Sequence, residues 1–372
     1  MDLGYSQRFN DLMAKGRMKP DLIELSMCDP PRFGFQPDPR VYDSPKMDIP
    51  ESGYPYLQEE LITGIVKRTK TYTGVSEDFD VVISNGCGGA FAILAIALRG
   101  MLVGIESPFY SPTYEYFKRT TDLWYIRCKP ELNWDIDLDL LRKELEQRKK
   151  PGVLFFVSPS NPTGHVHDEK VWRALVNIAG EFNQVLITDE VYDEMSFVPF
   201  QSLLPIAKDV PVIYMHGFSK VWRAPEIRVG YTLLYDPEEK CTPLFEDIQG
   251  ISKLGFGVNP ISQMQAISLL NEKMSYRRKQ FDEIQRRRDA LNDAISKSDN
   301  LSSVVAGGAT YQYIETPWND WKVCSELLEQ HNILISPGSA CDPFIGDKFV
   351  RVVFLNTVDN IQKMVIYLDQ LF

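Results

Sequence analysis

The sequence predicts an α/β protein with a large domain, in which helices enclose a mostly parallel mixed sheet, and a smaller α+β domain. The first observation is that short apolar runs alternate with helical patterns from Asp80 to Tyr235. The runs are VVIS at 81, LVGI at 102, LWYIR at 123, VLFFVS at 153, VLIT at 185, VIYM at 212 and VGYTLLY at 229. Apolar runs of this length, separated by helices, are typical of parallel strands buried on both faces.

The second observation is a change of pattern near Cys241, where apolar runs give way to helical segments. The charged stretch NEKMSYRRKQFDEIQRRRDALNDAISK is expected to form a long helix that faces solvent. Residues 302–372 combine the short runs SSVVA, TYQYIE, ILIS and FVRVVFL with two helical patterns. This mixture is typical of a small α+β domain.

These patterns divide the chain into three parts. Residues 1–45 are expected to be an N-terminal arm with part of the small domain, because they show little periodicity and many prolines. Residues 46–255 are expected to form the large domain, and residues 256–372 a linker helix with the small C-terminal domain.

The composition indicates a globular protein and disfavours a nucleic-acid partner. Hydrophobic residues make up 44% and charged residues 24% of the chain, both near the globular average. The net charge of -11 leaves only local basic pockets for anions. Six cysteines show no CxxC spacing, and no apolar run is long enough to span a bilayer. We therefore expect free thiols, no membrane association and a cytoplasmic location.

Glycines follow the first apolar run, at a place where open α/β sheets bind ligands. In NGCGGAFAIL, the residues Gly86, Cys87 and Gly88 begin a helix whose free backbone amides can hold a phosphate. A tight turn explains these glycines equally well. Gly86 and Gly88 also fit a dinucleotide-binding pattern with Glu106, although Phe91 replaces its third glycine.

Three later strand ends also carry polar groups. PSNPTG leaves the Asn161 amide free to bind a ligand, TDEVY brings Asp189 and Tyr192 to the end of VLIT, and Lys220 follows VIYM in HGFSK. Taken singly, these features are a turn, a helix cap and a surface lysine. Only their combination is specific.

That combination resembles a known family. In order and spacing, the chain contains SPFY at 107–110, PSNPTG at 159–164, TDEVY at 188–192, SK at 219–220 and Arg228. It resembles the class I and II aminotransferases, fold-type I pyridoxal-phosphate enzymes that include aspartate aminotransferase, from about Asp21 onward. The resemblance implies pyridoxal 5'-phosphate as cofactor. It also implies ping-pong transfer of an amino group between an L-amino acid and a 2-oxo acid.

The resemblance assigns the catalytic roles to Lys220, Asp189 and Tyr192. Lys220 would form a Schiff base with the cofactor aldehyde and later move a proton, with a pKa lowered by burial and the cationic cofactor. Asp189 would pair with the ring nitrogen and keep the ring an electron sink. Tyr192 and Asn161 would hydrogen-bond the ring hydroxyl, and Arg228 would hold the phosphate.

Two further residues acquire roles from the resemblance. Tyr110 in PFY would stack on the pyridine ring of the cofactor. Arg351 in FVRVVFL has apolar neighbours and would bind the substrate α-carboxylate, with Asn161 completing the substrate site. Taken alone, a structural salt bridge explains Arg351 equally well.

The phosphate site departs from the family pattern. Gly88, beside Cys87, stands where many members have a Ser or Thr, and Gly217 replaces a common serine. We therefore expect the phosphate to depend on Arg228 and on the backbone amides from Gly86 to Gly88.

A tyrosine from a second subunit is expected to add to this site. The resemblance implies a homodimer with shared active sites, in which Tyr54 or Tyr56 of SGYPYLQEEL crosses the interface. Cys28 in LSMCDPP occupies what is commonly a glycine at the mouth of the substrate site.

Two other functions stay open from the sequence alone. The same scaffold supports C–S and β-elimination, so a pyridoxal-phosphate-dependent lyase would share all of these residues. A NAD-dependent dehydrogenase would use Gly86, Gly88 and Glu106. The amino donor and acceptor are not specified by the sequence.

Overall fold

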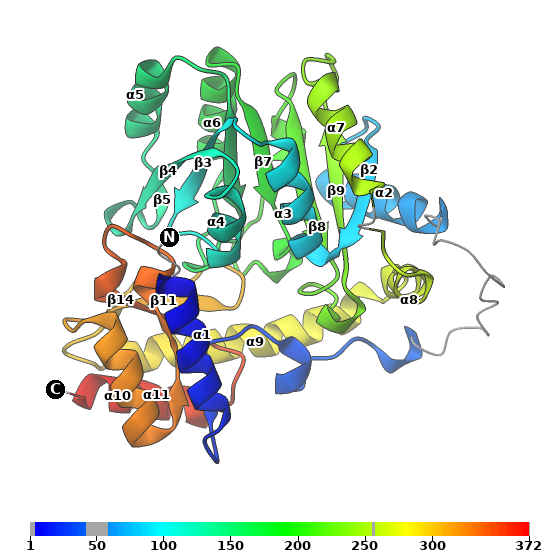
Figure 1. Ribbon diagram of the computed structural model, residues 1–372. Coiled ribbons are helices and arrows are strands. Elements are labelled where there is room, and N and C mark those ends of the chain that lie inside the picture. Colours follow the sequence, from blue (N-terminus) through cyan, green and yellow to red (C-terminus); the bar gives the residue numbers. More distant parts are fainter. Residues whose placement is uncertain (1–3, 42–58, 255–256, 372) are drawn as a thin grey trace.

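The computed structural model describes residues 4–41, 59–254 and 257–371 and is built on an eight-stranded sheet (Figure 1). Its strands are β2 (Asp80–Asn85), β3 (Leu102–Ser107), β4 (Asp122–Lys129), β5 (Asp135–Ile136), β6 (Val153–Val157), β7 (Val185–Asp189), β8 (Val212–Gly217) and β9 (Val229–Tyr235). Their order across the sheet is β2-β9-β8-β7-β6-β3-β4-β5. The pairs from β4 through β3, β6 and β7 to β8 are parallel, whereas β2, β9 and β5 pair antiparallel with their neighbours. The predicted α/β class and mostly parallel mixed sheet are confirmed.

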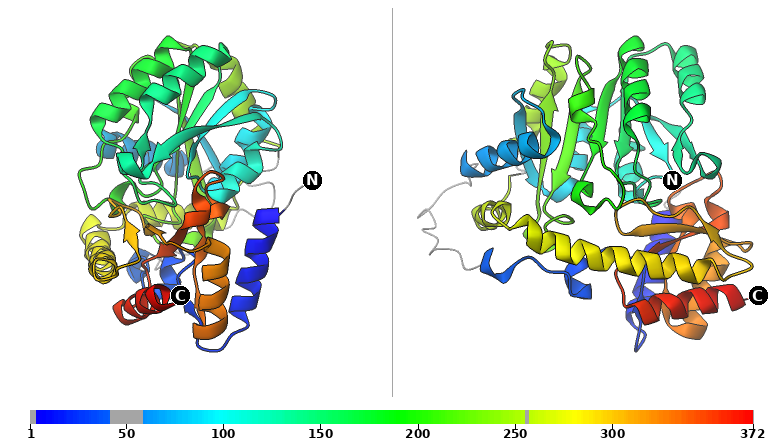
Figure 2. Two further views of the ribbon diagram at one scale, coloured as in Figure 1. Left: turned by 90° about the vertical axis from the view of Figure 1, so that its left-hand side faces the viewer. Right: turned by 180° about the vertical axis from the view of Figure 1, so that it is seen from behind.

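Helices cover both faces of this sheet. One face is covered by α2 (Glu59–Thr73), α5 (Leu138–Arg148) and α6 (Glu169–Glu181), the other by α3 (Gly86–Ala97), α4 (Ser111–Phe117) and α7 (Thr242–Ser252). Figure 2 shows these two layers of helices, with the sheet between them.

Strand β6 shows why its run VLFFV is apolar throughout. Leu154 and Phe156 pack into one core cluster, and Phe155 and Val157 into the cluster on the opposite face. Successive side chains of a strand point to opposite faces, so a central strand between two helical layers needs apolar residues at every position.

The alternation of strand and helix does not continue to the end of the sheet. Between β7 and β8 the chain forms only the short 3-10 turns Asp193–Met195 and Leu204–Ile206. Strand β8 then pairs antiparallel with β9 after another such turn, Pro225–Ile227. The expectation of a helix after every strand is therefore wrong here. An antiparallel neighbour such as β9 needs no helical crossover, whereas the parallel pair β7 and β8 is joined by a crossover that contains only the two 3-10 turns.

The C-terminal part forms a second layer below the large sheet. A four-stranded antiparallel sheet has the order β10-β11-β14-β13, with β10 (Ser302–Ser303), β11 (Tyr311–Glu315), β13 (Ser336–Pro337) and β14 (Phe349–Val353). Its helices are α10 (Asp320–His331) and α11 (Val358–Gln370), preceded by α8 (Pro260–Leu270). The long helix predicted from the charged stretch is α9 (Met274–Ile295), which crosses the molecule beneath the large sheet (Figure 2).

The N-terminal segment is more regular than its sequence indicates. It contains helix α1 (Gly4–Arg17), and strand β1 (Ile23–Glu24) pairs in parallel with β12 (Ile333–Leu334). The weak periodicity of this segment did not indicate α1, which packs against the C-terminal elements. Across the described ranges, no helix is long and apolar enough to cross a membrane.

Candidate active site

Two adjoining cavities open where the parallel strands end. The larger has a volume of about 580 Å³ and the smaller about 200 Å³. Four residues line both cavities: Tyr110, Pro112, Lys220 and Tyr311. The cavities lie between the carboxyl edge of the large sheet and the C-terminal layer, where an α/β protein is expected to bind its ligand.

Lys220 follows strand β8 and lies at the junction of the two cavities. Its Nζ donates a hydrogen bond of 2.8 Å to the backbone oxygen of Cys28 and lies 6.0 Å from the centre of the Tyr192 ring. Burial lowers the pKa of Lys220, but Cys28 and Tyr311 outweigh it, so its pKa is raised above the ordinary value. Burial by itself lowers the pKa of Lys220, as expected, but the interactions with Cys28 and Tyr311 reverse the net direction of the shift.

Asp189 is the last residue of β7, and its side chain is buried against the smaller cavity. Its Oδ1 accepts a hydrogen bond of 3.2 Å from the backbone amide of Val191. Within the described part of the chain, no cationic side chain lies within ion-pair distance of this carboxylate. Burial, with a contribution from Glu106, raises the pKa of Asp189 to about 7. A buried carboxylate with so little compensation favours a cationic ligand.

Arg351 lies in the middle of β14 and is 8% exposed. Its Nη1 donates to Oδ1 of Asn161 at 3.0 Å, and its Nη2 donates to the Ser26 carbonyl at 2.7 Å and to Oγ of Ser336 at 3.0 Å. Among the residues that the structure describes, no carboxylate forms an ion pair with Arg351, and its buried Nε has no hydrogen-bond partner. The structural salt bridge considered from the sequence is therefore absent from the described ranges.

Tyr192 and Tyr311 connect the two layers of the site. Their hydroxyl groups lie 2.8 Å apart, and burial raises the pKa of both phenols, so both remain neutral donors and acceptors. The guanidinium of Arg351 lies 5.0 Å from the centre of the Tyr311 ring. Sequence analysis missed Tyr311, because the pattern of TYQYIE predicts a strand without indicating which face meets the cavity.

Arg228 lines the smaller cavity, together with Cys87 and Gly88, and Gly86 lies against its guanidinium. Gly86 has a φ of +67°, and a Cβ added there would lie 2.7 Å from Nη2 of Arg228. Glycine is therefore needed both for the backbone conformation and for the close approach of the guanidinium. A Cβ on Gly88 would have no heavy atom within 4 Å, so the start of α3 opens onto free space. This combination of amides and a guanidinium fits a phosphate.

Cys87 explains one departure from the family pattern. A Cβ added to Gly217 would lie 3.2 Å from the Cys87 Sγ, which hydrogen-bonds the His216 carbonyl at 3.6 Å. The thiol thus occupies the space of a side chain at position 217, and burial raises its pKa well above the ordinary value. Gly217 therefore leaves free the space that the Cys87 side chain fills.

Tyr110 and Cys28, which the sequence also indicated, both line the larger cavity. The Tyr110 ring lies at both cavities, with its centre 6.3 Å from the centre of the Phe91 ring. Burial raises the pKa of Tyr110 to about 12. Cys28 lines the larger cavity and supplies the carbonyl that Lys220 contacts. Tyr54 and Tyr56 lie outside the described residues.

Glu106 is unsuited to a dinucleotide site. It is buried, and its Oε1 accepts a hydrogen bond of 3.0 Å from the backbone amide of Val157 on the neighbouring strand. Phe91, which replaces the third glycine of the pattern, packs at 6.0 Å from Phe155 in the core. The nicotinamide alternative is not supported.

The residues around the smaller cavity fit pyridoxal phosphate. A primary amine, a buried carboxylate that pairs with no cation of the described residues, an aromatic ring and an arginine beside the start of α3 line one cavity of about 200 Å³. These groups match an aldehyde, a pyridine nitrogen, a planar ring and a phosphate, respectively. Fold and site thus define a pyridoxal-phosphate enzyme of fold type I.

The comparisons with known proteins identify the family. The family model "Aminotransferase class I and II" matches residues 46–366. The aspartate aminotransferase of Thermotoga maritima is 29% identical over 313 residues, which cover 82% of this chain and 78% of that protein. The probable aspartate aminotransferase of Methanocaldococcus jannaschii is 24% identical and covers 95% and 94%. A solved alanine aminotransferase from Pyrococcus furiosus has a TM-score of 0.88 at 28% identity, covering 99% and 97%.

The chain belongs to the class I and II aminotransferases. It is a pyridoxal-phosphate-dependent enzyme that transfers an amino group between an amino acid and a 2-oxo acid. The resemblance in the sequence is confirmed, and the lyase alternative is not supported.

Proposed function

We propose that the residues around the two cavities carry out this amino transfer, with Lys220 at the reacting centre. Pyridoxal phosphate, when bound, supplies an aldehyde that takes up the amino group and a ring that withdraws electrons from the substrate Cα. Lys220 holds the cofactor and, once released, moves the proton from the substrate Cα as a general base and acid. Its position in both cavities supports this role.

Asp189 holds a proton on the cofactor's ring nitrogen. Its carboxylate is buried with one backbone donor, and a protonated pyridine would supply the missing cation. Tyr110 covers the ring, while Asn161 and Tyr192 contact its hydroxyl. Arg228 and the amides from Gly86 to Gly88, with the Cys87 thiol beside them, hold the phosphate, as the open space at Gly88 supports.

Arg351 binds the substrate α-carboxylate, and one observation carries this proposal. Arg351 is buried, it lines the larger cavity, and no carboxylate of the described chain pairs with it. A buried guanidinium is costly without an anion, and a carboxylate is the anion that every amino acid and 2-oxo acid brings. Asn161 contacts Arg351 at 3.0 Å and orients it toward the substrate.

The substrate side chain enters the larger cavity, and the lining supports a large apolar or aromatic amino acid. Phe9 and Met13 of α1, with Met27 and Tyr116, give the lining its apolar character. Arg119 also lines the cavity, but it forms an ion pair of 3.3 Å with Glu115. The relatives include a tyrosine aminotransferase from Dictyostelium discoideum as well as aspartate aminotransferases.

The active unit is a homodimer in which Tyr54 or Tyr56 reaches the phosphate of the partner subunit. This part of the proposal is supported by the resemblance to the family.

The large domain is taken as residues 46–255, flanked by 1–45 and 256–372. All six cysteines are free thiols, which supports a reducing cytoplasm as the location.

The absorption spectrum in the visible range tests these roles. Purified protein is mixed with pyridoxal phosphate, and single amino acids are then added, with R351M as the comparison variant. We expect a visible band that phenylalanine, tyrosine or leucine bleaches at low concentration in the wild type and only at much higher concentration in R351M. Preferential bleaching by aspartate would overturn the proposed substrate class. Equal bleaching of wild type and R351M would overturn the role of Arg351.

A further inference from the structure

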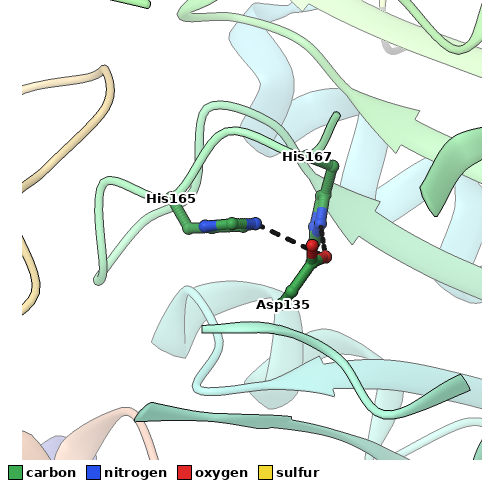
Figure 3. A group of neighbouring side chains, drawn as sticks. All are labelled: Asp135, His165 and His167. Atoms are coloured by element: carbon green, nitrogen blue, oxygen red, sulfur yellow. Dashed lines mark hydrogen bonds and ion pairs between the residues drawn. The ribbon is translucent and has the colours of Figure 1, made fainter. Parts of the chain in front are cut away.

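Three side chains outside the active site converge on one point (Figure 3). Asp135 comes from strand β5, whereas His165 and His167 come from the loop after β6. Oδ1 of Asp135 lies 2.8 Å from Nδ1 of His167 and 3.4 Å from Nε2 of His165. One ligand atom from each residue lies within 4.8 Å of the other two.

The distances are close to those of a metal site. With bonds of about 2.0 to 2.1 Å, the ligands of a tetrahedral zinc ion lie roughly 3.3 Å apart. The separations of 2.8 and 3.4 Å lie on either side of this value, so small side-chain movements would complete the geometry. Two imidazoles with one carboxylate form a ligand set typical of Zn²⁺ and similar divalent ions.

A further carboxylate supports one of these histidines from behind. Nε2 of His167 lies 3.6 Å from Oε2 of Glu106, and both side chains are almost fully buried. Histidines that bind a metal commonly direct their second nitrogen toward a carboxylate, which fixes the ring. In addition, Nε2 of His165 is buried and has no hydrogen-bond partner in the described part of the chain.

We propose that Asp135, His165 and His167 bind a divalent transition-metal cation, with Zn²⁺ as the reference ion. The cation takes the place of the proton shared between His167 and Asp135. Asp135 and His165 keep 23% and 14% of their side chains exposed, so an ion can enter and water can fill a fourth position. The proposed ion connects β5 to the loop 158–167, which carries Asn161 of the active site.

The ordinary interpretation of this cluster is a buried ion pair without metal. Burial lowers the pKa of His167, but Asp135 and Glu106 outweigh it and raise this pKa to about 9. A protonated His167 would then be held between two carboxylates. In this interpretation His165 only adds a 3.4 Å contact with Asp135, whereas the metal site uses it as a ligand.

The test measures zinc bound to the holoenzyme. Wild type, H165Q and H331Q are dialysed against micromolar ZnCl₂, and bound zinc is measured by inductively coupled plasma mass spectrometry. H165Q removes a partly exposed ligand and leaves the pair of Asp135 and His167 intact. H331Q is the matched control, because His331 stacks on Tyr367 at the end of α10, outside the cluster. X-ray absorption at the zinc edge identifies the ligand atoms.

We expect about one zinc ion per chain in wild type and H331Q, with only nitrogen and oxygen ligands, and an affinity at least tenfold weaker in H165Q, as for loss of a metal-site residue. Three results would overturn the proposal: no bound zinc in the wild type, equal affinity of wild type and H165Q, or zinc–sulfur bonds of about 2.3 Å, which would indicate a cysteine site.

Discussion

Two buried regions of this enzyme differ in whether their charged side chains are paired. The paired network beside β8 contains three arginines and three carboxylates: Arg68, Asp193, Glu194, Arg223, Glu272 and Arg277. Arg68 contacts Asp193 at 2.6 Å, and Arg223 contacts Glu272 at the same distance. In the two adjoining cavities, by contrast, neither Asp189 of the smaller cavity nor Arg351 of the larger one has an ion-pair partner within the described ranges.

This difference distinguishes a ligand site from a structural ion-pair network by burial and charge. Both regions are buried, so desolvation disfavours the charged form in each. The paired network compensates internally, which fits a structural role. The two cavities leave one negative and one positive group without an ion-pair partner in the described ranges. A cationic ring nitrogen of the cofactor and an anionic carboxylate of the substrate would pair with them.

The largest effect is expected for K220A. Loss of the lysine would remove both the proposed attachment point of the cofactor and the proposed general base, so kcat should fall by roughly 10⁴-fold, the upper range of general acid–base catalysis. K240A is the matched control, because Lys240 forms only surface ion pairs with Asp209 and Glu238. Steady-state kinetics and the visible spectrum check this. A K220A protein that keeps the activity of K240A would contradict the role of Lys220.

Replacement of one aspartate in each region should separate activity from stability. D189N should lower kcat by roughly 10²- to 10³-fold, as for loss of a preorganised charge at the reacting group, with little loss of stability. D193N should instead cost roughly 3–5 kcal/mol of unfolding free energy, because it leaves Arg68 with a weakened partner set. Kinetics and urea unfolding of both variants check this. Equal destabilisation by D189N and D193N would contradict the distinction between the cavities and the paired network.

Two buried arginines offer a similar contrast. R351M should raise KM for the amino acid and lower kcat/KM by roughly 10²-fold, since it removes charge-assisted hydrogen bonds worth about 3 kcal/mol. R223M should leave Glu272 buried beside only Arg277 and cost roughly 3–5 kcal/mol of stability. Kinetics and thermal unfolding measure both. If R351M lost as much stability as R223M, Arg351 would be a structural residue.

The two aspartates should also give opposite dependences of stability on pH in the cofactor-free protein. The folded pKa of Asp189 is raised to about 7, so its contribution is present below its unfolded pKa of about 3.9 and is lost as pH rises to about 7. Burial raises the pKa of Asp193, but Arg68 and His216 outweigh it and lower this pKa to about 2, so its contribution is lost as pH falls below about 4. Urea unfolding at several pH values, with D189N and D193N, checks both slopes. A D189N protein with the wild-type slope between pH 4 and 7 would contradict the first.

The smallest effect is expected for Y311F. It removes the 2.8 Å hydrogen bond to Tyr192, worth about 1 kcal/mol, and should lower kcat/KM about fivefold. Y313F is the control, because Tyr313 lies on the same strand but donates to the Gly338 carbonyl at 2.9 Å. It should lose stability without losing activity. Unchanged kinetics in Y311F would remove Tyr311 from the active site.

The sequence predicted the large sheet well because its signal is local. Each central strand is an apolar run, and Asn161, Asp189 and Lys220, which the resemblance selected, lie at or just after the end of such a run. The structure brings Asp189, Lys220 and Asn161 to one cavity because parallel strands end at the same edge.

Other features depend on contacts between distant segments and could not be predicted in this way. Tyr311 reaches the cavity through the pairing of β11 with β14. Cys28 contacts Lys220 through its backbone carbonyl, although the two residues are 192 positions apart in the chain. Helix α1 forms against the C-terminal layer, although its own periodicity is weak. Likewise, the contact between Cys87 and Gly217 can be recognised only from the structure, which places these two distant residues side by side.

The central claim is that Lys220 holds the cofactor between a buried carboxylate and a buried arginine. The most direct measurement is reduction of the holoenzyme with borohydride, which fixes the cofactor to its lysine, followed by peptide mass spectrometry. The account predicts one pyridoxyl group per chain, on the peptide that contains Lys220. Modification of a different lysine, or of none, would contradict it.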